Sequence, residues 1–141
     1  MQKIQFYALD RNPPLKERTR LKFFIEKLFI TEKRKLGNLS YIFCSDEHLL
    51  TINKDFLKHD FYTDVITFDL SSSTNEIEGE VYVSVDRIKD NAKQLGVSFK
   101  EELHRVIFHG ALHLCGYKDK NKTDQQQMTL AENRYLKLYF R

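Results

Sequence analysis

One segment near the C-terminal end of the sequence predicts a complete helix, including both of its ends. Ser98, followed three residues later by Glu101, forms a capping box, which is a common start signal of a helix. Gly116 supplies the stop, because glycine tolerates the left-handed conformation that ends many helices. Between these ends, apolar residues recur at the spacing of one helical face: Leu103, Val106, Ile107, Gly110 and Leu114. The rest of the chain must therefore provide a core that covers this face.

Shorter segments predict strands mixed with further helices. We expect strands at residues 4–9, 39–44, 64–70 and 80–85, where β-branched, aromatic and other apolar residues cluster or alternate. We expect helices at 15–35, 46–57, 86–95 and 123–139. The last of these would start with a capping box of Thr123 and Gln126 and bury Met128, Ala131, Tyr135 and Leu138. Because strands and helices do not alternate strictly, the pattern predicts the α+β class: a small mixed four-stranded sheet packed with about five helices.

Length and composition agree with one folded domain over residues 1–141. The chain has 141 residues, of which 41% are hydrophobic and 30% charged, and this balance favours a folded core over disorder. The sequence has no apolar run that could span a bilayer and no secretory signal, so we expect a cytoplasmic protein without a membrane partner. Two cysteines are too few for a disulfide framework.

The predicted helix carries two histidines that could hold a metal ion. His109 and His113 are four residues apart, so their imidazoles lie one turn apart on the same helical face. Two imidazoles at this spacing often bind zinc, although an isolated pair can also be packed or surface histidines. Zinc peptidases carry a glutamate directly after the first histidine, where this chain has Gly110. We therefore expect a metal-binding helix in a central cleft, but not a peptidase.

Asp119 is the first candidate for a third ligand. Gly116 can turn the chain back toward the end of its own helix, and the segment up to Asp119 can then cross the mouth of the site. Two histidines and one carboxylate would leave the fourth zinc position for water, as in catalytic zinc sites. Asp124 is a second candidate, but it also suits the first turn of the next helix. Cys115 is a poor ligand because it points away from His113 on a helix.

Two further carboxylates are candidates for the chemistry around these histidines. Glu102 lies seven residues before His109 on roughly the same stripe of the helix. It could act as a catalytic base, or it could orient a ligating histidine through a hydrogen bond. Asp64, at the start of a predicted strand, is a candidate for substrate binding, with a role as a helix or loop cap as the alternative.

Several stretches of the chain resemble one known family. The sequence HGALHLCGYKD at 109–119 resembles the signature of the bacterial YbeY endoribonucleases, H-G-x-L-H-L-x-G-Y-D-H. TDVITF at 63–68 resembles the family's T-D-V-L-S-F, and GEVYVS at 79–84 resembles its G-D-I-V-I-S strand. Single positions also match: Asn53, Glu102, Leu103, Met128 and Glu132. The order and spacing hold over roughly residues 40–135.

The resemblance implies a single-strand-specific, metal-dependent endoribonuclease. Such an enzyme would act in maturation of the 3′ end of small-subunit (16S) ribosomal RNA and in late ribosome quality control, with ribosomal RNA and ribosomal proteins as partners. The resemblance also implies one zinc ion per chain, held by His109, His113 and Asp119. Two alternatives stay open: a non-catalytic, zinc-containing ribosome assembly factor, and a metal-dependent hydrolase of another substrate.

The chain departs from the family pattern around the site. The family usually has a histidine at the position of Asp119 and an aspartate at that of Lys118. A carboxylate ligand should make the metal a weaker Lewis acid. The family commonly has an arginine facing the cleft at the position of Leu57, where it could hold a phosphate. We therefore expect Lys54, Lys58 or Lys118 to bind phosphate instead, or the nuclease activity to be reduced.

Three aromatic residues could contact unpaired bases: Phe61, Tyr62 and Tyr117. Stacking on such rings would favour single-stranded RNA. The alternative for at least two of the three is packing in the core.

Overall fold

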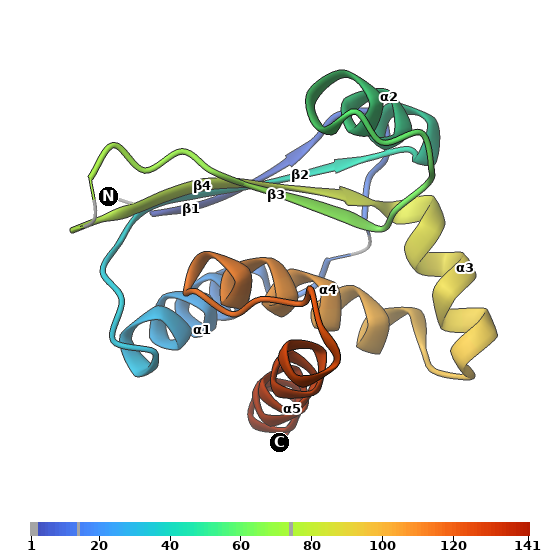
Figure 1. The fold of residues 1–141 in the computed structure, drawn as a ribbon. Coiled ribbons are helices and arrows are strands. Elements are labelled where there is room, and N and C mark those ends of the chain that lie inside the picture. The colour runs from blue at the N-terminus through green and yellow to red at the C-terminus, as the bar shows by residue number, and fades with distance from the viewer. Residues whose placement is uncertain (1–2, 14, 74) are drawn as a thin grey trace.

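Five helices and four strands make up the described parts of the chain, which are residues 3–13, 15–73 and 75–141 of a computed structural model (Figure 1). The strands are β1 (Ile4–Ala8), β2 (Leu36–Cys44), β3 (Val65–Asp69) and β4 (Ile77–Ser84). The helices are α1 (Arg18–Thr31), α2 (Asp46–Leu57), α3 (Val85–Leu95), α4 (Phe99–Leu114) and α5 (Lys122–Tyr139). The predicted α+β class, with a mixed sheet in a single domain, is confirmed.

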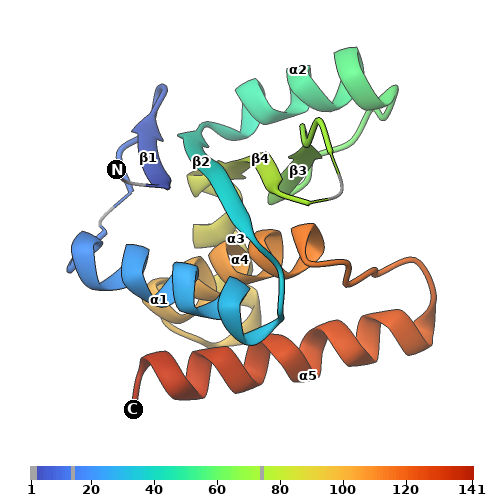
Figure 2. The same cartoon turned by 90° about the vertical axis from the view of Figure 1, so that its left-hand side faces the viewer.

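The sheet has the strand order β1-β2-β4-β3. β1, β2 and β4 are parallel, whereas β3 is an antiparallel edge strand that pairs with β4. α2 lies on one face of this sheet, and α1 and α4 lie on the other, with α5 beneath α4 (Figures 1 and 2). The loop from α2 into β3 thus approaches α4 around the edge of the sheet. None of the helices in the described residues has the length and apolar character required to cross a bilayer.

The central helix is α4, which packs between the sheet and α5 (Figure 1). All members of its predicted apolar face are buried: Leu103, Val106, Ile107, Gly110 and Leu114. Gly110 permits the close approach to the sheet, because a Cβ atom there would lie 2.7 Å from Cγ1 of Val81. The Ser98 side chain accepts a hydrogen bond from the Glu101 N–H at 3.0 Å, so the predicted N-cap is confirmed.

The start and the buried face of α5 differ from the prediction. Its N-cap is Asn121, whose side chain accepts a hydrogen bond from the Asp124 N–H at 2.8 Å. The capping box of Thr123 and Gln126 is therefore wrong, because Thr123 already lies within the first turn. Leu138 is exposed, whereas Leu136 and Tyr139 are buried. The buried face of α5 packs against both α1 and α4. Contacts that are distant in the sequence therefore determine which residues of α5 are buried.

The first helix is shorter than expected at both ends. α1 covers Arg18–Thr31 instead of residues 15–35. Glu17 and Lys33, which flank it, have φ angles of 53° and 60°. A left-handed backbone conformation cannot continue a right-handed helix, so these two residues set its limits.

Candidate metal centre

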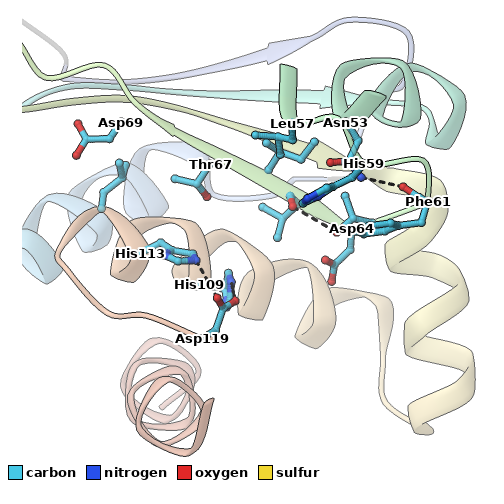
Figure 3. Close-up of a pocket in the computed structure, with 14 residues that line it drawn as sticks. Asn53, Leu57, His59, Phe61, Asp64, Thr67, Asp69, His109, His113 and Asp119 are labelled. Carbon is cyan, nitrogen blue, oxygen red and sulfur yellow. Dashed lines mark hydrogen bonds and ion pairs between the residues drawn. The ribbon is translucent and has the colours of Figure 1, made fainter. Parts of the chain in front are cut away.

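His109 and His113 lie on the C-terminal half of α4 and face the same pocket (Figure 3). Their ring centroids are 5.3 Å apart. The side chains are 19% and 33% exposed, so both are shielded but reachable from the pocket. The helical spacing therefore places the two imidazoles as the sequence predicts.

Asp119 completes a group of three potential ligands. Gly116 has a φ of +107°, and after it the chain returns along the end of α4. Oδ2 of Asp119 lies 3.6 Å from Nε2 of His109, and Oδ1 lies 3.4 Å from Nε2 of His113. One potential ligand atom from each of the three residues lies within 4.8 Å of the others. Asp124, the alternative carboxylate, is not part of this group.

The donor set fits a divalent metal ion. Two imidazole nitrogens and a carboxylate oxygen are common ligands of zinc and related transition metals. In the parts of the chain that the structure describes, no other group of His, Cys, Asp and Glu side chains meets the same spacing. The three side chains can therefore bind a metal ion at the end of α4.

Glu132 of α5 contacts the ring nitrogen of His109 that faces away from Asp119. Its Oε2 accepts a hydrogen bond of 2.7 Å from Nδ1–H of His109, and its Oε1 accepts one of 2.9 Å from Arg105. The Glu132 side chain is only 9% exposed. Because a carboxylate accepts and does not donate, Nδ1 carries the hydrogen and Nε2 is left to face Asp119. In metal-binding histidines, the ring nitrogen that does not bind the metal commonly donates a hydrogen bond to such a carboxylate.

The charges around His109 favour its protonated form. Burial lowers the pKa of His109, but the contact with Glu132 and the charges of Asp119 and Asp64 outweigh this, so the pKa lies above its ordinary value. A proton and a metal ion would therefore compete for Nε2.

The site opens on a pocket of about 450 Å³ (Figure 3). His109, His113 and Asp119 form one wall of the pocket. The facing wall comes from α2 and the loop after it: Asn53, Leu57, His59 and Phe61. Oγ1 of Thr67 on β3, another lining residue, is buried and has no hydrogen-bond partner within the described residues. The pocket therefore lies between the potential ligands on one side and α2 with its following loop on the other.

Comparison with known proteins identifies the family. The family model described as "Endoribonuclease YbeY" matches residues 14–139 of this chain. The chain belongs to the YbeY family. A protein named endoribonuclease YbeY from Cytophaga hutchinsonii is 45% identical over 135 residues, which cover 96% of this chain and 94% of the relative. Its namesake from Porphyromonas gingivalis is 43% identical over 136 residues, which cover 96% of this chain and 89% of the relative.

A solved structure supports the fold of this YbeY-family chain. The solution structure of a protein from Thermotoga maritima superposes with a TM-score of 0.61 at 27% sequence identity. The superposition covers 97% of this chain and 89% of that protein. The resemblance that the sequence motifs indicate is thus confirmed over nearly the whole chain.

The position at which YbeY proteins commonly carry an arginine is apolar here, and within the described residues no lysine or arginine lines the pocket in its place. Leu57 lines the pocket, whereas Lys54, Lys58 and Lys118 are not among the lining residues. Lys54 instead lies 3.3 Å from a carboxylate oxygen of Asp60. Any phosphate contact from the remaining two lysines would therefore be made at the rim.

Asp64 and Glu102 differ in which pockets beside His109 they line. Asp64 lines the large pocket and also a smaller one of about 140 Å³, which Glu102 and Glu132 line as well. Burial raises the pKa of Asp64, against the effect of the nearby His109. Glu102 is 5% exposed, and burial followed by the charge of Asp64 raises its pKa. Of the two candidate carboxylates, Asp64 alone borders the pocket of the potential ligands.

Of the three aromatic candidates for base stacking, Phe61 lines the pocket. Tyr117 donates a hydrogen bond of 3.0 Å to Glu32 and packs against the core. The Tyr62 hydroxyl donates to Glu47 at 2.6 Å. Thus one of the three is placed to contact a ligand in this pocket.

The sequence does not reveal the role of Glu132, which there matches only the spacing of the family. Glu132 lies four residues after Met128 and three before Tyr135, both of which are buried on α5. A carboxylate on the buried face of a helix requires a polar partner. That position could therefore have indicated a buried contact, but not that His109 and Arg105 would provide it.

Proposed function

We propose that this chain is a cytoplasmic, metal-dependent endoribonuclease that cleaves single-stranded RNA. Its role would be in 3′-end maturation of small-subunit ribosomal RNA and in late ribosome quality control, with ribosomal proteins as partners. Membership in a family whose relatives are named endoribonuclease YbeY supports the activity. The observation that carries the proposal is the convergence of His109, His113 and Asp119 on one wall of an open pocket of about 450 Å³.

The metal in this proposal is one zinc ion per chain, held by His109, His113 and Asp119. The mixed nitrogen and oxygen donors support zinc, and three protein ligands leave a further position open, as catalytic zinc sites require. When bound, the metal supplies a Lewis acid for phosphodiester hydrolysis.

The protein side chains would divide the remaining tasks. Glu132 would hold the ring of His109 in place, and Arg105, which donates a hydrogen bond to Glu132, would hold Glu132. Asp64 borders the pocket, and its raised pKa suits it to hold a proton near the substrate. Lys58 and Lys118 are exposed and each precedes a pocket-lining residue, so both could bind flanking phosphates at the rim.

Glu102 remains our proposal for the catalytic base, with a supporting role behind His109 as the alternative. Burial and the charge of Asp64 raise its pKa, which makes its carboxylate a stronger base. It lines only the smaller pocket, so a proton would have to pass by way of Asp64 or His109, which line both pockets.

The decisive experiment compares metal content and RNA cleavage in three purified, untagged proteins: the native chain, Asp119→Ala and Asp124→Ala. We expect about one zinc per native chain by elemental analysis, and cleavage of unpaired RNA that a chelator abolishes and zinc restores. Asp119→Ala should lose both properties. Asp124→Ala is the matched control and should keep both, because Asp124 lies outside the ligand group. Cleavage that persists in metal-free Asp119→Ala would contradict the proposal.

One observation favours a second candidate, a zinc-containing ribosome assembly factor that does not cleave RNA. The pocket-lining residues of the described chain include neither lysine nor arginine, and Leu57 occupies the position where an arginine is common in the family. A zinc-loaded native chain that binds RNA but leaves it intact would support this candidate. Cleavage of peptides but not of RNA would instead support another hydrolase.

A further inference from the structure

The loop between α2 and β3 brings two aromatic rings to the wall of the pocket that faces the potential metal ligands (Figure 3). The rings of His59 and Phe61 are nearly parallel, with centroids 5.0 Å apart and an interplanar angle of 20°. Phe61 is nevertheless 56% exposed. Two stacked rings with such exposure leave a flat apolar face open to a ligand.

A single buried residue holds the backbone that carries both rings. Asn53 is 2% exposed, and its side-chain amide donates a hydrogen bond of 2.8 Å to the carbonyl of Phe61. Its backbone carbonyl accepts a hydrogen bond of 3.1 Å from the N–H of His59. Lys58, directly before His59, has a φ of 58°. This left-handed conformation ends α2 and turns the chain toward the pocket. The loop is therefore fixed by specific contacts, so the rings are pre-positioned before any ligand binds.

The chemistry of the pocket favours a neutral planar group at this wall. Among the described residues, the wall that faces the potential ligands has neither lysine nor arginine to bind a phosphate. A nucleobase combines a flat face with hydrogen-bonding edges and carries no charge. It therefore suits this wall better than the RNA backbone does.

We propose that His59 and Phe61 form a stacking subsite for one unpaired nucleobase, and that Asn53 is the positioning residue of this subsite. The proposal rests on the proposed function, since it takes RNA as the substrate, and it deepens that function by assigning a substrate contact. A base within a duplex has both faces covered by its neighbours. The subsite therefore gives a physical reason for preferring single strands.

The test measures binding of a short unpaired RNA, 2′-O-methylated to slow cleavage, to the metal-loaded protein by fluorescence anisotropy. Phe61→Ala should weaken binding roughly 5- to 100-fold, while Phe61→Tyr should bind nearly as the native chain does. Phe23→Ala is the matched control, because Phe23 is also an exposed phenylalanine but lines a different pocket, on α1. It should bind as the native chain does.

A second series replaces one nucleotide of the RNA at a time with an abasic one. One abasic position should weaken binding to the native chain and have no further effect on Phe61→Ala. A loss that is equal at every position, or unchanged binding in Phe61→Ala, would overturn the subsite. Cleavage of unmodified RNA by the native chain would then still support the proposed function. Conversely, one abasic position could affect the native chain alone while no RNA is cleaved. That result would support the subsite and refute the proposed nuclease activity.

Discussion

Replacing Glu132 with glutamine should weaken metal binding although Glu132 is not a ligand. The substitution keeps the size of the side chain but removes the charge that accepts the 2.7 Å hydrogen bond from Nδ1–H of His109. Loss of such a partner typically lowers metal affinity about 10- to 100-fold, or about 1.4–2.7 kcal/mol. The Glu132 side chain is only 9% exposed, so water cannot readily replace it, and we expect the upper half of this range. Arg105 would keep its 2.7 Å hydrogen bond to Asn133, which should limit the damage to the fold.

The assay is a zinc titration in competition with a coloured chelator at fixed pH. It would compare the native chain with Glu132→Gln and with Glu78→Gln, which removes an exposed carboxylate on β4. Circular dichroism would verify that each variant is folded. Equal zinc affinity in the native chain and a folded Glu132→Gln would refute the idea that Glu132 acts through His109. An equal loss in Glu78→Gln would show that net charge, and not orientation of the ring, is responsible.

Three further changes test the close packing of α4, the burial of His104 and the role of Glu102. Gly110→Ala should lower the free energy of unfolding by about 1–3 kcal/mol in a urea titration, because its Cβ would lie 2.7 Å from Val81; an unchanged value would mean that α4 can move away from β4. Burial lowers the pKa of His104 below its ordinary 6.5, so the unfolded chain takes up a proton that the folded chain does not. The free energy of unfolding should therefore fall as the pH drops below about 6.5, by up to about 1.4 kcal/mol per unit, and His104→Gln should flatten this slope; equal slopes would contradict the burial argument. Glu102→Gln should reduce the cleavage rate about 10²- to 10⁴-fold at unchanged zinc content; a native rate would exclude Glu102 as the base and leave Asp64 as the candidate.

The helix that carries the two histidines, α4, was predictable because the residues that specify it lie close together in the sequence. Ser98 lies within one turn of the amide that it caps, and the helical spacing alone puts His109 and His113 on one face. Asp119 follows Gly116 by three residues, so a single turn suffices to bring its carboxylate back to the histidines. The residues that define this site are thus close enough in sequence for the backbone geometry to relate them.

The partners of the site were not predictable in the same way. Glu132 meets His109 across 23 residues, and this contact depends on how α5 packs beneath α4. The stacking of His59 on Phe61 likewise depends on hydrogen bonds made by the buried Asn53. The N-cap of α5 was placed two residues too late, at Thr123 instead of Asn121, since both residue types can cap a helix. Each of these features depends on packing that a single stretch of sequence does not specify.

The packing of α4 also explains why the histidines face the pocket at all. Gly110 and Leu114 directly follow His109 and His113, and both are buried against β4. A Cβ at Gly110 would lie 2.7 Å from Val81, and one at Gly79 would lie 2.8 Å from Leu114, so helix and strand are in close contact at two levels. Two such contacts fix the rotation of the helix about its axis, and consecutive residues differ by about 100° around that axis. The core therefore sets the direction of both imidazoles before any metal binds, and Glu132 has only the ring orientation of His109 left to determine.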